Sequence, residues 1–326
     1  MTNRRHFLAQ AAGAALLPWA SRASASDGPA LARILLGAPA GGSGDLMARR
    51  LADKLSGAYA GKVIVENKPG AGGQLAISAL KESAEDGSTL LLTPSSLLSI
   101  YPYTYSRLPY KPQEDLVPVS LAAYANHALG VGPSVPGSVK TLQDFIAWAQ
   151  AHPGAASYGS PAPGSIPHLI MVVLAKQTGV ALRHIPYKGS TQGLQDLRGG
   201  QLSAMSSPVG AFLPHLASGQ VRLLAVSGEQ RSPLVPEVPT YRQAGHAITA
   251  REWYGFFLPA KASPGVVTRA ATQLHRALGA PEVAEGIRQF GLEAAHSTPQ
   301  QLAEMLKADS EEWRALVKSV GFTAES

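Results

Sequence analysis

Short runs of apolar residues alternate along the chain with longer stretches in which apolar residues recur at helical spacing. The runs at 34–36, 63–65 and 88–92 predict strands, and Met47, Leu51, Leu55 and Ala58 predict a helix after the first of them. Strands that alternate with helices are typical of α/β folds with parallel strands. Right-handed crossovers place the loops after such strands at one edge of the sheet, where open sheets bind ligands.

The same rhythm restarts near residue 129. Thr141 and Asp144 predict a capping box ahead of a helix at 145–151, and a helix at 166–178 is expected to end at Gly179. Short strands are predicted at 157–159, 181–185 and 221–226, and a strand at 253–259 carries the chain back. Thr298 opens a long amphipathic helix. These segments predict a second sheet with strand-end loops of its own.

Two glycine-rich turns follow the first two predicted strands, at residues 38–45 and 66–73. We expect each to lead into a helix, the second at 72–83. The first N–H groups of a helix lack partners and carry a partial positive charge, so such a turn is a ready site for an anion. Two of these turns in adjacent strand–helix units indicate a negatively charged ligand. The alternative is that the glycines only make tight turns.

The glycine turns lack the marks of a nucleotide site. The run at 70–75 ends in leucine, where the dinucleotide fingerprint needs Gly or Ala, and no GK[ST] follows any glycine cluster. The chain contains no cysteine, which excludes disulfides and thiolate metal sites. Its nine histidines form no HExxH motif. We therefore expect neither a metal nor a cofactor.

The sequence offers few residues that could act together in catalysis. Ser165 and His168 stand about one helical turn apart, but the GxSxG elbow of a serine hydrolase is absent. Ser160 and Ser165 fit hydrogen-bond donors or a helix N-cap better. Asp45 either offsets the dipole of its helix or orders the glycine loop around a ligand. What is left is recognition of a carboxylate by backbone N–H groups, with each charge-assisted bond contributing about 1.5–3 kcal/mol.

The first residues resemble an export signal. A basic segment with Arg4 and Arg5 precedes an apolar stretch at 8–20, and the small residues 23–25 predict cleavage near Ala25. The arginine pair favours a twin-arginine signal, with an ordinary secretory signal as the alternative. Both place the mature protein in the periplasm. Without Arg4, Arg5 and Arg22, 25 basic residues stand against 22 acidic ones, and a net charge of +3 does not favour nucleic acid as a partner.

In their order and spacing, several motifs resemble those of the Bug-type extracytoplasmic solute receptors, the binding components of tripartite tricarboxylate transporters. The resemblance runs from about residue 32 to 321, with landmarks at 39–45, 65–73, 86–90, 164–168, 186–189 and 231–240. It implies an α/β, two-lobed periplasmic-binding-protein-like fold of type II, with a mixed or parallel sheet and flanking helices in each lobe and two crossover segments. We expect one lobe from residues 26–130 plus 250–326 and the other from 131–249, after a signal peptide at 1–25.

The resemblance also implies which residues hold the ligand. Residues of the first lobe would bind one carboxylate, partly through ordered water; they are Pro39, Ala40, Gly41, Gly42, Ser43, Asp45, Thr93, Ser95 and Ser96. Residues of the second lobe would close on it from the other side; they are Ser160, Gly164, Ser165, His168 and Tyr187. Pro161 and Pro163 remove two backbone donors from that second loop and stiffen it.

The function expected from residues and resemblance is that of a monomeric, non-enzymatic periplasmic receptor. It would capture a small carboxylate, such as an organic acid, an acidic amino acid or an aromatic acid, and deliver it to membrane transporter subunits. One alternative is a ligand-sensing receptor for a signalling partner. Another is a periplasmic hydrolase that uses Ser165 and His168, and a third is a structural protein that no acid stabilises.

Overall fold

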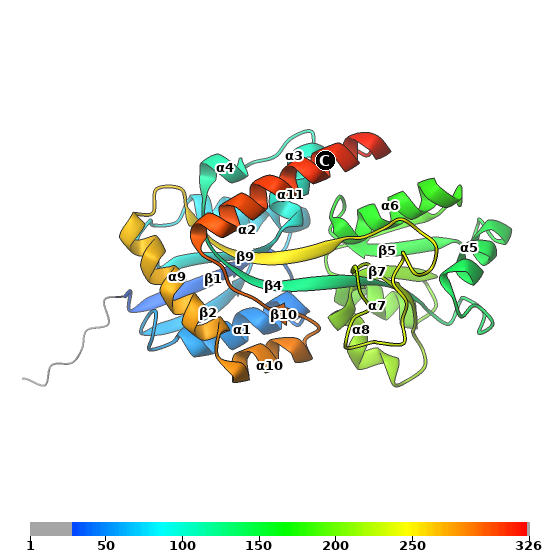
Figure 1. Ribbon diagram of the computed structural model, residues 1–326, viewed down its shortest axis with the longest axis horizontal. Coiled ribbons are helices and arrows are strands. Elements are labelled where there is room, and N and C mark those ends of the chain that lie inside the picture. Colours follow the sequence, from blue (N-terminus) through cyan, green and yellow to red (C-terminus); the bar gives the residue numbers. More distant parts are fainter. Residues whose placement is uncertain (1–27, 325–326) are drawn as a thin grey trace, which may run out of the picture.

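A computed structural model describes residues 28–324, which form one ten-stranded sheet with helices on both faces (Figure 1). The expected signal peptide at 1–25 lies outside the described residues. In order across the sheet the strands are β2 (Lys62–Asn67), β1 (Leu31–Leu36), β3 (Thr89–Pro94), β9 (Arg251–Pro259), β4 (Leu116–Val131), β7 (Ala204–Pro208), β5 (Ser157–Pro161) and β6 (Arg183–Tyr187), while β10 (Glu293–Ala294) and β8 (Arg222–Val226) also pair with β4.

Two long antiparallel strands, β4 and β9, join the two halves of the sheet. We call the half with β1, β2 and β3 the first lobe and the half with β5, β6, β7 and β8 the second lobe. β4 pairs with β9 as far as Asn126 and with β7 from His127 onward. β1 is parallel to β2 and β3, and β5 is parallel to β6 and β7, as the alternation of strands and helices predicts.

Each face of the first lobe has its own apolar core. Along β9 the side chains alternate, with Trp253 and Phe257 on one face and Tyr254 and Phe256 on the other. One face is covered by α1 (Ser43–Leu55), α9 (Pro264–Leu278) and α10 (Pro281–Gln289). The other is covered by α2 (Gln74–Lys81) and α11 (Pro299–Val320). The short helices α3 (Tyr101–Thr104) and α4 (Pro112–Asp115) also belong to this lobe.

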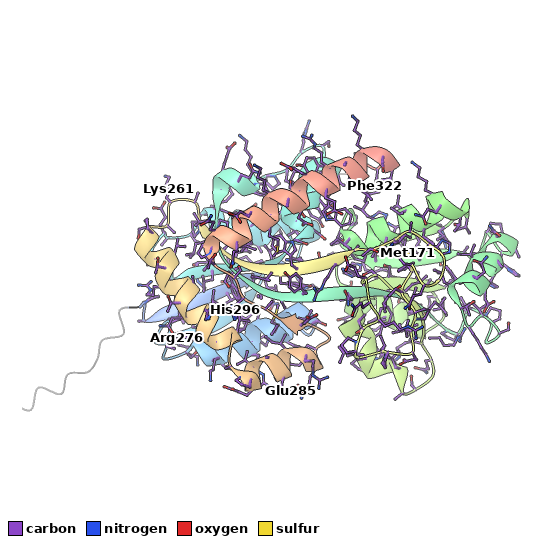
Figure 2. All side chains as sticks on the ribbon, in the orientation of Figure 1. Met171, Lys261, Arg276, Glu285, His296 and Phe322 are labelled. Carbon is purple, nitrogen blue, oxygen red and sulfur yellow. The ribbon has the colours of Figure 1, made fainter. Side chains whose placement is uncertain are left out.

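The second lobe repeats this layered plan. On one face α5 (Leu142–Ala151) and α6 (Ile166–Thr178) pack on the strands, and on the other α7 (Ser190–Arg198) and α8 (Val209–Leu216) do so. The C-terminal end of α11 joins this lobe, because Trp313, Val317 and Phe322 pack into the core beside α6. Figure 2 labels Phe322 near the end of α11 and Met171, a residue of α6, in the second lobe. The last helix therefore contacts both lobes, although the sequence assigned it to the first alone.

Several local predictions are confirmed. α6 covers the predicted residues and ends at Gly179, whose φ of 71° suits glycine. Thr141 with Asp144 and Thr298 with Gln301 form the two capping boxes. The helix expected at 72–83 is shorter, with a 3₁₀ turn (Ala71–Gly73) ahead of α2. Gly72 and Gly73 have positive φ there, which delays the start of the α-helix.

Two leucines, one on α1 and one on α2, test how much of the stability lies in the first-lobe core. Leu51 on α1 is 0% exposed, whereas Leu75 on α2 is 51% exposed. Because Leu51→Ala removes buried methyl groups and leaves a cavity, it should lower the free energy of unfolding by about 2–5 kcal/mol. Leu75→Ala is the matched control and should change it by less than about 0.5 kcal/mol. Urea denaturation of both variants measures the difference, and equal losses would contradict the assigned core.

Candidate functional site

A cavity of about 130 Å³ lies between the two lobes. A water molecule needs roughly 10–15 Å³ on this measure, so the space suits a small organic molecule. The first lobe lines it with residues after β1, with Gly72 and Gly73, with the end of β3 and with β9. The second lobe lines it with the loops that follow β5, β6 and β7. The strand-end loops of both lobes therefore meet at one place, as the crossover argument predicts.

The helices that begin at this cavity have one feature in common: their N-cap residues make no side-chain cap hydrogen bond. The N-cap residues of α1, α2, α6, α7 and α8 are Gly42, Gly73, Ser165, Gly189 and Pro208, and each lines the cavity without a side-chain cap hydrogen bond. Away from the cavity, α5, α9 and α11 are capped by threonine or serine side chains, whereas α3, α4 and α10 have no side-chain cap. The cavity therefore collects several positive helix ends, and those of α1, α2, α7 and α8 offer backbone N–H groups to an anion, whereas at α6 the N–H of Ile166 already bonds Ser96.

The first glycine turn is held in shape by Asp45. Its carboxylate accepts hydrogen bonds from the Gly41 N–H, from the Asn67 amide and, through both oxygens, from Arg49, all at 2.9–3.0 Å. Burial raises the pKa of this carboxyl, but the hydrogen bonds from Arg49, Gly41 and Asn67 outweigh it and lower the pKa below its usual value. Of the two roles open to Asp45, the contacts favour ordering the loop.

The second glycine turn supports the first. A side chain at Gly37 would lie 2.6 Å from the backbone of Gly73, so the two turns touch where only glycine fits. The hydroxyl of Tyr101 donates a hydrogen bond to the carbonyl of Gly72. This turn thus forms part of the cavity wall as well as shaping α2.

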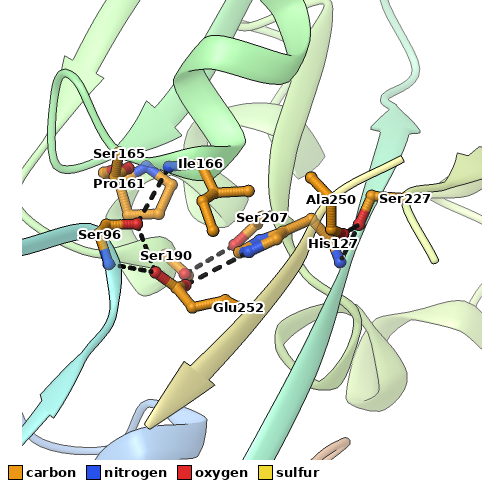
Figure 3. A network of polar contacts seen from close by, with 10 residues as sticks. All are labelled: Ser96, His127, Pro161, Ser165, Ile166, Ser190, Ser207, Ser227, Ala250 and Glu252. Carbon is orange, nitrogen blue, oxygen red and sulfur yellow. Dashed lines mark hydrogen bonds and ion pairs between the residues drawn. The ribbon is translucent and has the colours of Figure 1, made fainter. Parts of the chain in front are cut away.

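Glu252 is a site residue that the sequence analysis did not name. It lies on β9 on the same side as Tyr254, lines the cavity, and is 4% exposed. Its Oε1 accepts hydrogen bonds from the hydroxyl and the backbone N–H of Ser96, and its Oε2 lies 3.3 Å from Nε2 of His127 on β4 (Figure 3). The available signal was an acidic residue directly before the apolar part of the strand, which begins at Trp253.

Ser96 also links the two lobes. Its hydroxyl accepts a 3.1 Å hydrogen bond from the N–H of Ile166, the first residue of α6, while it donates to Glu252 (Figure 3). Nearby, Tyr105 donates to the carbonyl of Pro163 at 2.9 Å. The lobes are therefore in direct polar contact beside the cavity.

The structure brings together part of the predicted site. The predicted residues that line the cavity are Pro39, Gly42, Ser43, Asp45, Ser96 and Ser165. The others stand outside its lining; they are Ala40, Gly41, Thr93, Ser95, Ser160, Gly164, His168 and Tyr187. Several of these have partners elsewhere, since the Tyr187 hydroxyl donates to Asp196 and the Ser160 hydroxyl bonds the ring of His184. Their contact with a ligand stays a prediction.

Ser165 and His168 are each engaged away from the other. The Ser165 hydroxyl donates to the carbonyl of Pro161, and Nδ1 of His168 accepts from the Gly164 N–H. The His168 ring stacks on His184 at 3.7 Å between centroids, and burial with that neighbour lowers its pKa to about 3. This geometry does not activate the serine as a nucleophile.

Among residues 28–324, no helix is long and apolar enough to cross a membrane, and no three His, Cys, Asp or Glu residues gather as a metal site.

Two lobes joined by a pair of crossover strands, with a cavity between them lined from both sides, define a periplasmic-binding-protein-like receptor fold. The chain belongs to the tripartite tricarboxylate transporter receptor family, whose model matches residues 47–322. This confirms the resemblance stated from the sequence.

Relatives and solved structures agree with this assignment. The chain is 34% identical to the Bordetella pertussis protein BugT over 289 residues, 87% of each chain. R. palustris Rpa4515, solved with adipate, is 28% identical with a TM-score of 0.85 over 90% of this chain and 98% of that one. MatC from Rhodopseudomonas palustris, solved with bound malate, is 25% identical with a TM-score of 0.81 over 88% of this chain and 98% of that one.

The hydrogen bonds of Asp45 should make the free energy of unfolding depend on pH. Because its folded pKa lies below the usual 3.8, Asp45 stabilises the fold above that pH, and the contribution is lost as the pH falls through the folded pKa. Asp45→Asn should lower the free energy of unfolding at pH 7 by about 1.5–3 kcal/mol, and the gap to wild type should narrow at acidic pH. Denaturant titrations between pH 7 and pH 3 measure it. The control is Asp53→Asn on the exposed side of α1, and a gap that does not vary with pH would refute the argument.

Proposed function

We propose that this protein is an exported, non-enzymatic receptor that captures a small carboxylate between its lobes and delivers it to membrane transporter subunits. The observation that carries the proposal is the group of uncapped helix N-termini around the cavity. A carboxylate there would accept hydrogen bonds from the backbone N–H groups of Ser43 and Gly44 at the start of α1. Adipate in Rpa4515 and malate in MatC support a carboxylate as the ligand class.

Backbone donors alone can supply much of the affinity that such a receptor needs. Three or four charge-assisted bonds of about 1.5–3 kcal/mol each, less the cost of ordering, approach the roughly −8 kcal/mol of micromolar binding. The exposed side chain of Lys188 also lines the cavity and adds a positive charge. We propose that the receptor works as a monomer in the periplasm, with membrane subunits docking on its closed form.

We further propose that the ligand shifts a balance between open and closed lobes, with β4 and β9 as the hinge. The closed form depends on close contacts such as that of Gly210, at the start of α8, with the backbone of Phe290 in the first lobe. Residues 131–249 would then move as one body against the rest.

A substitution at Gly42 tests the anion site by adding a negative charge without creating a steric clash. A side chain there meets nothing within 4 Å, and the residue is the N-cap of α1. In Gly42→Asp the new carboxylate would bond the N–H groups of α1 and repel a ligand carboxylate. We expect affinity to fall by at least about tenfold, corresponding to 1.4 kcal/mol, with no loss of stability in the absence of ligand.

Gly42→Asn is the matched control, because it adds a side chain of the same shape without the charge. Its affinity should fall less than that of Gly42→Asp. Isothermal titration calorimetry with dicarboxylates and amino acids measures both. Wild-type affinity in Gly42→Asp would refute the site.

Gly210 tests closure. A methyl group at this position would lie 1.8 Å from the carbonyl oxygen of Phe290, so the lobes of Gly210→Ala must separate. The variant should bind ligand at least about tenfold more weakly and show a larger radius of gyration by small-angle scattering. Gly137→Ala is the control, since a methyl group there meets nothing within 4 Å. Unchanged affinity and radius in Gly210→Ala would argue against closure at this contact.

A further inference from the structure

The cavity has positive helix ends and also a buried acid. The helix ends attract a negatively charged group of a ligand, and the acid attracts a positively charged one. Asp45, the other acid in the lining, is balanced by Arg49, which bonds both of its oxygens. Among residues 28–324, no arginine or lysine lies within ion-pair distance of Glu252. Ser96 satisfies its Oε1 with two hydrogen bonds, but a hydroxyl and an amide N–H are neutral donors.

His127 is poorly placed to neutralise Glu252. The contact of its Nε2 with Oε2 is an ion pair only if the ring is protonated. The ring is 0% exposed, and in the part of the chain that the structure describes neither of its nitrogens has a hydrogen-bond partner. A protonated ring would carry two buried N–H donors without acceptors in hydrogen-bond geometry, which is costly. The negative charge of Glu252 is therefore best balanced from the cavity side.

We propose that Glu252 is a specificity residue that binds a positively charged amine of the ligand, so that the receptor takes an amino-acid-type zwitterion in preference to a plain carboxylic acid. The inference rests on the proposed carboxylate-binding function and adds a second subsite to it. The amine donates to Oε2 of Glu252, while the ligand carboxylate lies at the uncapped helix ends.

One small molecule can reach both subsites. Tyr254 and Glu252 are two residues apart on the same face of β9, which separates them by about 7 Å. The ring of Tyr254 lies against Gly44, where a methyl group would be 3.3 Å from it, so Tyr254 marks the start of α1. Ser96 connects Glu252 to the start of α6 in the second lobe (Figure 3). An amine on Glu252 therefore lies beside the contact that holds the lobes together.

The test compares pairs of ligands that differ only in the amine: L-glutamate with glutarate, L-aspartate with succinate, L-leucine with 4-methylpentanoate, and L-phenylalanine with 3-phenylpropionate. Calorimetry on the wild-type protein should find at least one pair in which the amine-bearing member binds about tenfold or more tightly than its partner, the ratio expected for a charged hydrogen bond. Measurements on the wild-type protein are enough to overturn the proposal. Equal or tighter binding of the amine-free member in every pair that binds would do so.

Glu252→Gln then assigns the preference to the residue, because it keeps the shape and an oxygen that can accept from Ser96. It should lose about tenfold or more in affinity for the amine-bearing ligand and leave the amine-free partner unchanged or improved. Glu114→Gln, which removes an exposed acid on α4, is the control for net charge. Equal losses for both members would mean that Glu252 only supports the fold. No binding by any member of any pair would refute the proposed carboxylate function itself, whereas binding without amine preference would refute this inference alone.

Discussion

An α-helix begins with backbone N–H groups that have no partner within the helix, and this protein turns several such beginnings toward one cavity. At α5, α9 and α11 threonine or serine side chains satisfy the first N–H groups. At the cavity the corresponding positions are glycine, proline or a serine whose hydroxyl bonds Pro161 instead. A capping side chain would compete with an anion for the same donors. α10, away from the cavity, has no side-chain cap either, so the constraint on which the site depends is the meeting of several uncapped helix starts at one cavity.

The connection between the lobes follows from the same geometry. Since β4 and β9 cross from one half of the sheet to the other, the strand ends of both lobes face a common space. Close contacts at the edges of that space involve backbone and small residues, such as the Ser96 hydroxyl on the Ile166 N–H and Gly210 on Phe290. Such contacts can form and separate without exposing a large apolar surface. α11 packs on both lobes and so connects them at a third place, beside β4 and β9.

Local signals in the sequence predicted much of this fold. The capping boxes, the glycine end of α6 and the glycine turn before α1 depend on neighbouring residues, so they can be inferred from the order of the chain. β4 was not predicted from the sequence. It pairs with β9 up to Asn126 and with β7 from His127, so its residues follow no single alternation of apolar and polar positions. The docking of Phe322 beside α6 and the contact of Gly37 with Gly73 depend on distant segments, which periodicity does not report.

Glu252 illustrates why a site can be harder to infer than a fold. Burying a carboxylate is costly, and the two donors of Ser96 offset only part of the cost. A glutamine would accept the same hydrogen bonds without a charge, so stability alone does not explain an acid at this position. Its value lies in discrimination, because an unbalanced acid repels a ligand that carries only negative groups and attracts one that also carries an amine. A specificity residue of this kind weakens the protein alone and strengthens the complex, and its local signal, an acid before an apolar run, does not report that role.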